Sequence, residues 1–400
     1  MPVRATKRGA GRTRLERDCD VLICGGSFAG LAVARELRSS GAEVLVIDRY
    51  ELGERATSAC AAPTAWLERL ELQGSLRQTF HELRLHTPWT DTRWTLPWSF
   101  STFDYRALCA LMWEQTELPE SAYETAKVDG IVRAGRCAED RDGGGGLHTV
   151  HTDRGDIRAP LVVDCLGWRR VLSSSVCVQP PRAPLTRGLE VHPAGHGEEL
   201  ELWIDPRYAR AGYGWSFPAG GELRVGVCSF RPADHVKDPT VRLASDLGLD
   251  AVRYQGNWIP HRLRPAVEDG VFFAGDSAGH CLPLTAEGIR TALYFGIACG
   301  RELRAVLDGR RTREEGLERY GSFSHSHRGA YRGLLRIQRA VCRPTSWSTT
   351  PMWAVVLRNR RFAARVFDRY LAIAPPSFVG AASSHSAQVA PRAGSASTVA

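Results

Sequence analysis

Hydrophobic positions near the start of the chain form two kinds of segment. Residues 19–24 and 44–47 are short, largely apolar runs, which is typical of strands buried on both faces of a sheet. Between them, residues 28–39 carry Leu31, Ala32, Ala34 and Leu37 at helical spacing. The pattern predicts strand, helix and strand, the beginning of a parallel sheet covered by helices.

Later segments carry the same signals. Residues 103–117 have helical spacing behind Asp104, an expected N-cap, and residues 121–166 alternate like a strand meander. Residues 55–102 are rich in Trp, Pro and Thr, show no clear periodicity and are expected to cover a substrate. Further expected elements are strands at 161–163, 200–204, 223–230 and 271–274, a helix near 290–303, and helices over 312–371 that break at Pro344 and Pro351.

The loop after the first expected strand has the spacing of a dinucleotide cradle. Its sequence is Gly25-Gly26-Ser27-Phe28-Ala29-Gly30. Gly25 permits a tight turn, Gly30 lets helix and strand pack closely, and the helix N-terminus offers N–H groups to a pyrophosphate. Ser27 replaces the usual middle glycine and is small enough to keep the close approach. Asp48, followed by Arg49, ends the second strand, where an acid accepts hydrogen bonds from ribose hydroxyls.

A second acidic motif, far along the chain, indicates a flavin rather than a nicotinamide. Gly275 and Asp276 follow the apolar run 271–274, where a carboxylate can reach a polyol such as ribityl. The helix that begins at Gly288-Ile289 can direct N–H groups at the pyrimidine end of an isoalloxazine. We therefore predict that two distant stretches hold one FAD.

Composition and charge narrow the classes of protein further. No run of about 18 apolar residues occurs, so no membrane span is expected. The 11 cysteines are scattered without a C-x-x-C pair, which predicts neither zinc nor disulfides and fits the cytoplasm. Residues 319–369 hold 11 arginines and one acid, which suits peripheral contact with the inner membrane face. With three lysines and no recognition motif, no nucleic-acid partner is expected.

Three further strings make the sequence similar to the FAD-dependent oxidoreductases of the p-hydroxybenzoate-hydroxylase fold, and most closely to the geranylgeranyl reductase family. Tyr213-Gly214-Trp215-Ser216-Phe217-Pro218, then seven residues and Gly226, matches the Y-x-W-x-F-P-x7-G signature of those reductases. A Cys-Ala element of the family matches Cys60-Ala61, and a helical arginine matches Arg106. The resemblance runs from about residue 18 to residue 307 and departs from the family where Ala62 and Pro63 replace glycines.

The resemblance assigns roles to these positions. It implies that Tyr213, Trp215, Phe217 and Pro218 border the substrate cavity. It implies cofactor contacts for Cys60, Ala61, Arg106 and Val128, the last through its backbone to adenine. The residues expected to take part in catalysis are Tyr213, Trp215, Cys60 and Glu287, and the proton donor is expected among Tyr213, Cys60 and Glu287.

Motifs and resemblance together predict an α/β fold. A Rossmann-type FAD-binding domain is expected to be interleaved with an α+β substrate domain built on an antiparallel sheet, followed by C-terminal helices. The expected boundaries are 1–17 for a disordered basic leader, 18–54, 103–180 and 255–310 for the FAD domain, 55–102 and 181–254 for the substrate domain, 311–375 for the helices and 376–400 for a disordered tail.

The implied activity is reduction of carbon–carbon double bonds in an isoprenoid or similar lipophilic substrate, with NAD(P)H or ferredoxin reducing the FAD. One alternative is a flavin monooxygenase or halogenase, although Phe217 stands where halogenases have isoleucine, and residues 50–110 hold no lysine. A second is a cyclase or isomerase without net redox change. A third is a flavin-holding scaffold without turnover.

Overall fold

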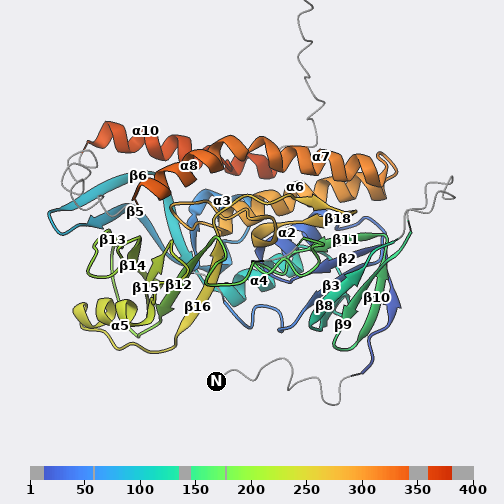
Figure 1. Cartoon of the computed structure of the whole chain (residues 1–400), viewed down its shortest axis with the longest axis horizontal. Helices are drawn as coiled ribbons and strands as arrows, with labels where there is room; N and C mark the ends of the chain where they lie inside the picture. Colours follow the sequence, from blue (N-terminus) through green and yellow to red (C-terminus); the bar gives the residue numbers. More distant parts are fainter. Residues whose placement is uncertain (1–12, 57–58, 135–145, 176–177, 342–358, 381–400) are drawn as a thin grey trace, which may run out of the picture.

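The structure is a computed structural model that describes residues 13–56, 59–134, 146–175, 178–341 and 359–380. Within these residues the chain forms three β-sheets, and its C-terminal helices lie along one side of them (Figure 1). The six-stranded and eight-stranded sheets lie toward opposite ends of the molecule, and α6 runs along the first of them (Figure 1). Among the described helices, none is both long and apolar enough to cross a bilayer.

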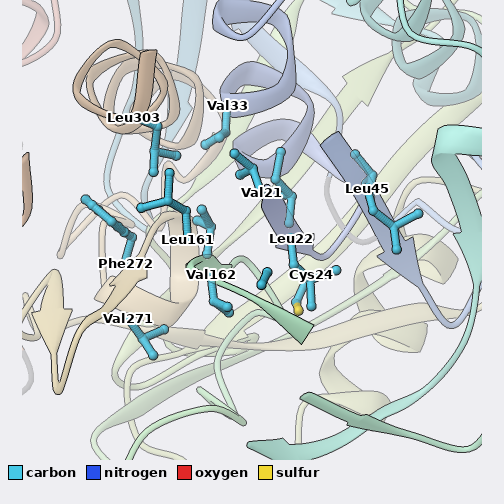
Figure 2. Packing of buried hydrophobic residues seen from close by; sticks show 14 of the residues in the cluster. Val21, Leu22, Cys24, Val33, Leu45, Leu161, Val162, Val271, Phe272 and Leu303 are labelled. Carbon is cyan, nitrogen blue, oxygen red and sulfur yellow. The ribbon is translucent and has the colours of Figure 1, made fainter. Parts of the chain in front are cut away.

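The six-stranded sheet is the one that the apolar runs predict. Its strands, in spatial order, are β17 (Val267–Glu268), β18 (Val271–Phe273), β11 (Leu161–Asp164), β2 (Val21–Cys24), β3 (Val44–Asp48) and β7 (Tyr123–Thr125). All neighbours except β17 and β18 run parallel. Helices α2 (Phe28–Glu36) and α6 (Ile289–Leu307) cover one face, and Val33 and Leu303 pack on the strands (Figure 2). The strands are buried on both faces, which is why their sequences do not alternate.

A four-stranded sheet packs beside this core. Its order is β1 (Arg17–Asp18), β10 (Gly155–Ala159), β9 (His148–Thr152) and β8 (Val128–Val132). Residues 1–17 were expected to be a disordered leader, but Leu15 is buried and Arg17 of strand β1 pairs with Ile157. The end of that segment therefore adds an edge strand, whereas residues 1–12 lie outside the described part of the chain.

The eight-stranded sheet forms the opposite end of the molecule. Its order is β16 (Gln255–Pro260), β12 (Leu185–Val191), β15 (Leu223–Ser229), β14 (Gly212–Pro218), β13 (Leu200–Trp203), β5 (Leu76–His86), β6 (Asp91–Phe103) and β4 (Ala61–Pro63). Helix α5 (Lys237–Asp246) packs on one face, against Val191, Val225 and Val227. The other face is left to the site described below.

Two sequence expectations change in this sheet. Residues 55–102, expected to be irregular, contain the long hairpin of β5 and β6. Register shifts between Leu76 and Gln78, and between Phe80 and Glu82, interrupt the two-residue alternation that would have predicted the hairpin. Strand β16 was expected within the FAD domain, but it pairs with β12 and so joins the eight-stranded sheet.

The remaining helices connect the sheets or cover them. Helix α4 begins where the sequence predicts, because the Asp104 side chain accepts a hydrogen bond from the Ala107 N–H at 2.9 Å. Helix α4 spans Tyr105–Glu114. The other described helices not yet named are α3 (Thr64–Arg69), α7 (Arg313–Ser326), α8 (Arg328–Val341) and α10 (Arg360–Leu371). Short 3-10 turns lie at Gln73–Ser75, Glu120–Ala122, Gly275–Ala278 and Pro376–Gly380.

The C-terminal helices belong to the core. Tyr320, Tyr331 and Leu371 are almost fully buried. The turn at 376–380 was expected to be part of a disordered tail, but Arg301 donates hydrogen bonds to the carbonyls of Phe378 and Val379 at 3.0 Å. Pro344, Pro351 and residues 381–400 lie outside the described residues.

Candidate functional site

A single cavity of about 1250 Å³ joins the two larger sheets and the C-terminal helices. Cavities that hold one small molecule usually measure roughly 300–1,000 Å³, so this one has room for more than one ligand. Ser27 and Asp276, from the two distant motifs, both line it. Tyr213 from the eight-stranded sheet and Phe367 from α10 line the same space. The tertiary structure thus brings the expected nucleotide cradle and the expected substrate segment together.

Two positions of the first loop require glycine because the surrounding backbone approaches them closely. Gly25 has a φ of +114°, and a Cβ there would lie 2.3 Å from the Cys165 carbonyl oxygen. A Cβ on Gly30 would lie 1.8 Å from the Gly25 carbonyl oxygen. Neither glycine needs a ligand for its role, because each permits a close backbone approach. Four residues of the loop line the cavity: Gly26, Ser27, Phe28 and Ala29.

Asp48 braces this loop from the end of β3. Its carboxylate accepts hydrogen bonds from the N–H groups of Gly26 at 2.8 Å and of Tyr50 at 3.0 Å. Burial raises the pKa of Asp48, and these hydrogen bonds oppose that rise. Asp48 still faces the cavity, as do Arg49 and Val128. The acid, the loop and Val128 therefore line the same cavity.

The second motif supplies an acid whose carboxylate accepts no hydrogen bond from the described residues. Asp276 lines the cavity at the start of the 3-10 turn Gly275–Ala278. Burial raises its pKa to about 6, and Arg264 opposes the rise. This partly buried carboxylate faces a cavity in which a ligand rich in hydroxyl groups would donate hydrogen bonds to it. Gly275, Gly288 and Ile289 line the cavity beside it, and Ile289 opens α6. This arrangement fits the polyol and ring system of FAD.

Three residues expected at the site do not line the cavity. Among the described residues, Ala59 and Ala61 line it while Cys60 does not, and burial raises the pKa of the Cys60 thiol to about 12. Arg106 is exposed, and its backbone lies over Gly53. Pro218 ends β14, where its carbonyl accepts a hydrogen bond from Thr102 at 2.7 Å. The expected contacts of Cys60, Arg106 and Pro218 therefore stay predictions that the lining of the cavity does not support.

The Y-x-W-x-F-P string forms strand β14, so its aromatic residues share one face. Tyr213, Trp215 and Phe217 all line the cavity. The indole of Trp215 lies across the neighbouring strand at Gly226, where a Cβ would come within 2.2 Å of Trp215 Cζ2. Its Nε1 donates to Glu190 Oε2 at 3.2 Å, one strand further along. The last glycine of the signature is thus the space that the tryptophan ring occupies.

The floor of the cavity changes in polarity across the sheet. Over β5, β6, β13 and β14 it is apolar, and the residues there are Leu83, Leu85, Trp94, Leu96, Phe100, Leu200, Leu202 and Phe217. Over β12 and β16 it carries Glu190, Gln255 and Asn257. Sequence reasoning missed Glu190, because a single acid in an apolar strand carries no motif. The floor suits an extended apolar ligand that reaches a polar end.

Glu287 lies on the loop before α6, and both of its carboxylate oxygens are engaged. Arg290 donates to them at 2.6 and 2.8 Å, and the Tyr370 hydroxyl also donates to Glu287. On the same loop, the Thr285 carbonyl accepts a hydrogen bond from the Tyr213 hydroxyl. Glu287 therefore holds this loop against α6 and α10. The expected part of Glu287 in catalysis stays a prediction.

We expect the substitution Gly226→Ala to lower the free energy of unfolding by about 1–3 kcal/mol, because the added methyl group forces the Trp215 ring from its place. Urea denaturation measures this change. Gly188→Ala is the matched control on the neighbouring strand, since a Cβ there would meet its nearest atoms at 3.7–4.0 Å. Equal stability of the two variants would contradict the packing of Trp215 over Gly226.

Comparison with known proteins agrees with this geometry. A family model described as an FAD binding domain matches residues 18–171. Digeranylgeranylglycerophospholipid reductase 3 of Methanosphaera stadtmanae is 24% identical over 335 residues, which cover 78% of this chain and 84% of the relative. Rifampicin monooxygenase of Streptomyces venezuelae is 26% identical over 314 residues, which cover 72% of this chain and 65% of that protein.

A solved structure shows the same fold. A geranylgeranyl bacteriochlorophyll reductase-like protein from Thermoplasma acidophilum superimposes with a TM-score of 0.71 at 14% sequence identity, covering 92% of this chain and 98% of that one. The fold, the cradle and the family model together define an FAD-dependent oxidoreductase. Within that class the chain is similar to geranylgeranyl reductases, which confirms the resemblance seen in its sequence.

Proposed function

We propose that this chain reduces carbon–carbon double bonds of an isoprenoid or a comparable lipophilic substrate. The observation that carries the proposal is the continuity of one cavity from the dinucleotide cradle to the apolar floor beside Trp215 and Phe217. The relative from Methanosphaera stadtmanae, named a digeranylgeranylglycerophospholipid reductase, supports the substrate class. FAD, reduced by NAD(P)H or ferredoxin, supplies the hydride when it is bound.

The chain's own residues provide binding, placement and an apolar enclosure. Backbone N–H groups of the Gly26–Ala29 loop are proposed to hold the pyrophosphate, Asp48 the ribose and Asp276 the ribityl hydroxyls. The N-terminus of α6 at Ile289 is proposed to stabilise negative charge on the pyrimidine end of the ring. Trp215 belongs to the wall that excludes water from the alkene.

Anaerobic turnover with mass analysis tests this function. The FAD-loaded protein, supplied with dithionite and a polyprenyl lipid, is expected to yield product heavier by two hydrogens for each reduced bond. Chemically reduced free FAD is the control. Rapid oxygen uptake with an oxygenated or halogenated product would instead support the monooxygenase or halogenase alternative. A product of unchanged mass would support the cyclase or isomerase alternative. If no product forms, the result would support the alternative of a flavin-holding scaffold without turnover.

The outer surface of α8 and α10 is proposed to contact an anionic membrane. Ile337 is 46% exposed and Val366 is 48% exposed, and both also line the cavity, so its mouth opens at this surface. Arginines surround these two residues, and the exposed ones are Arg328, Arg332, Arg336, Arg339, Arg361, Arg365 and Arg369. A lipid substrate could pass from the bilayer into the cavity by this mouth.

Reversing three of these charges is expected to release the protein from anionic vesicles. Each arginine near a membrane surface contributes about 1 kcal/mol, so Arg332→Glu/Arg336→Glu/Arg339→Glu predicts a loss of affinity on the order of 100-fold. Sedimentation with phosphatidylglycerol vesicles measures it. Arg38→Glu/Arg69→Glu/Arg182→Glu changes the net charge equally at exposed positions outside α8 and α10 and is the control. An equal loss in both variants would contradict the proposed surface.

A further inference from the structure

Reduction of an alkene consumes a proton as well as a hydride, and each residue named for this role from the sequence either lies outside the cavity lining or is engaged in other hydrogen bonds. Cys60 does not line the cavity. Glu287 is held by Arg290. The hydroxyl of Tyr213 donates to the Thr285 carbonyl, and burial raises its pKa well above the ordinary value. The cavity is also lined by a further acid, on strand β12. This inference rests on the function proposed above.

Glu190 has the required position. It lies on β12 with 3% of its surface exposed, and it lines the cavity. Strand pairing places it in one row with Gly226 and Trp215 on one side and Gln255 on the other. Because Gly226 has no side chain, nothing stands between the carboxyl group and the indole. Glu190 thus lies at the polar end of the apolar floor.

Hydrogen bonds hold the carboxyl group and connect it to the surface. Its Oε1 accepts from His192 Nε2 at 2.9 Å and from Gln255 Nε2 at 3.0 Å, and its Oε2 accepts from Trp215 Nε1 at 3.2 Å. His192 Nδ1 lies 3.9 Å from Glu222 Oε1, and the Glu222 side chain is 27% exposed. The His192 side chain is itself 15% exposed, so the imidazole reaches from the Glu190 carboxyl group to solvent.

We propose that Glu190 is the general acid of the reaction and that His192 restores its proton. One alkene π bond breaks, and two C–H bonds form. The hydride, with its two electrons, comes from the reduced flavin cofactor and adds to one alkene carbon. The other carbon takes the Glu190 proton, which leaves a carboxylate. His192 then protonates that carboxylate and regains its own proton from solvent through the Glu222 side.

A single-turnover experiment on the FAD-loaded, pre-reduced protein tests this role. Mixing it anaerobically with the polyprenyl lipid should reoxidise the flavin at least about 100-fold more slowly in Glu190→Gln, since general acids contribute roughly 10²–10⁴ in rate. Reduction of the flavin by dithionite should stay unchanged. Glu201→Gln is the matched control, because Glu201 also pairs with a histidine, His86, in the same sheet but is not among the described residues that line the cavity.

A histidine variant separates proton supply from a structural role. In His192→Gln the first turnover should remain within about threefold of the unaltered protein, whereas steady-state turnover with excess dithionite falls at least tenfold. Reoxidation of Glu190→Gln at the unaltered rate would overturn the proposal, as would equal losses in both phases for His192→Gln. Rescue of the first turnover by Glu190→Asp, in part, would support it.

A measurement that requires no turnover separates the proposed role of Glu190 from the proposed reduction of alkenes. Infrared difference spectra of the FAD-loaded protein should show a protonated-carboxyl band that is missing in Glu190→Gln and kept in Glu201→Gln. Absence of that band overturns the role of Glu190 even if the lipid is reduced. If the unaltered protein saturates no alkene, the proposed function fails, whatever the infrared result.

Discussion

Replacing Arg290 by leucine is expected to lower the free energy of unfolding by about 3–5 kcal/mol. The Arg290 side chain is fully buried and pairs with Glu287. It also donates to the carbonyls of Leu371 at 2.9 Å and Ala374 at 3.2 Å, which holds the end of α10 against α6. Without the guanidinium, the Glu287 carboxylate keeps the Tyr370 hydroxyl but no cation, and the two carbonyls lose the hydrogen bonds from Arg290. Urea denaturation of purified protein measures the change.

A second arginine of the same helix provides the control. Arg304 pairs with Asp308 near the surface, where its side chain is 31% exposed. Exposed pairs contribute about 0–1 kcal/mol, so Arg304→Leu should change stability by no more than that. Combining Arg290→Leu with Glu287→Leu should restore part of the loss, because no unpaired charge remains. Equal effects of the two single substitutions would contradict the role of Arg290 as a buried clamp.

The substitution Gly30→Ala is expected to abolish stable FAD binding. A Cβ at this position would lie 1.8 Å from the Gly25 carbonyl oxygen and 3.3 Å from the Ile23 side chain. Alanine favours a helix over glycine by about 1 kcal/mol, but a backbone clash of this size forces helix and loop apart. We expect at least about 100-fold weaker binding of FAD and a loss of about 1–3 kcal/mol in the free energy of unfolding. Visible absorbance and quenching of FAD fluorescence measure the binding.

Gly329→Ala tests whether the effect belongs to the cradle. Gly329 is also helical, in α8, and a Cβ there would meet no described atom within 4 Å. That variant should keep its FAD and should be neutral or more stable by up to about 1 kcal/mol. Full FAD content in Gly30→Ala would show that the loop does not hold the nucleotide as proposed.

Local pattern and spacing were enough to predict the nucleotide-binding half. The strands at 21–24 and 44–48 are buried on both faces. Their apolar runs were therefore enough to predict them as strands inside a covered sheet. The cradle was also readable, because a tight turn and a close approach require glycine wherever they occur. The acids Asp48 and Asp276 each follow a strand, and the carboxyl ends of neighbouring parallel strands lie at one edge of a sheet. Their convergence on one cavity therefore followed from their order along the chain.

The substrate half depended on contacts that no local pattern records. The bulged hairpin of β5 and β6 hides its alternation, and Cys60 turns from the cavity although both of its neighbours face it. The place of Glu190 beside Trp215 results from the pairing of three strands, and the closure of the cavity by Phe367 results from docking of α10 on β6. By itself, the sequence determined the class of protein and the cofactor end of the site, because a repeated backbone geometry sets those residues. Only the tertiary structure decided which side chains meet over the substrate floor, because each of those contacts joins elements that are distant in the chain.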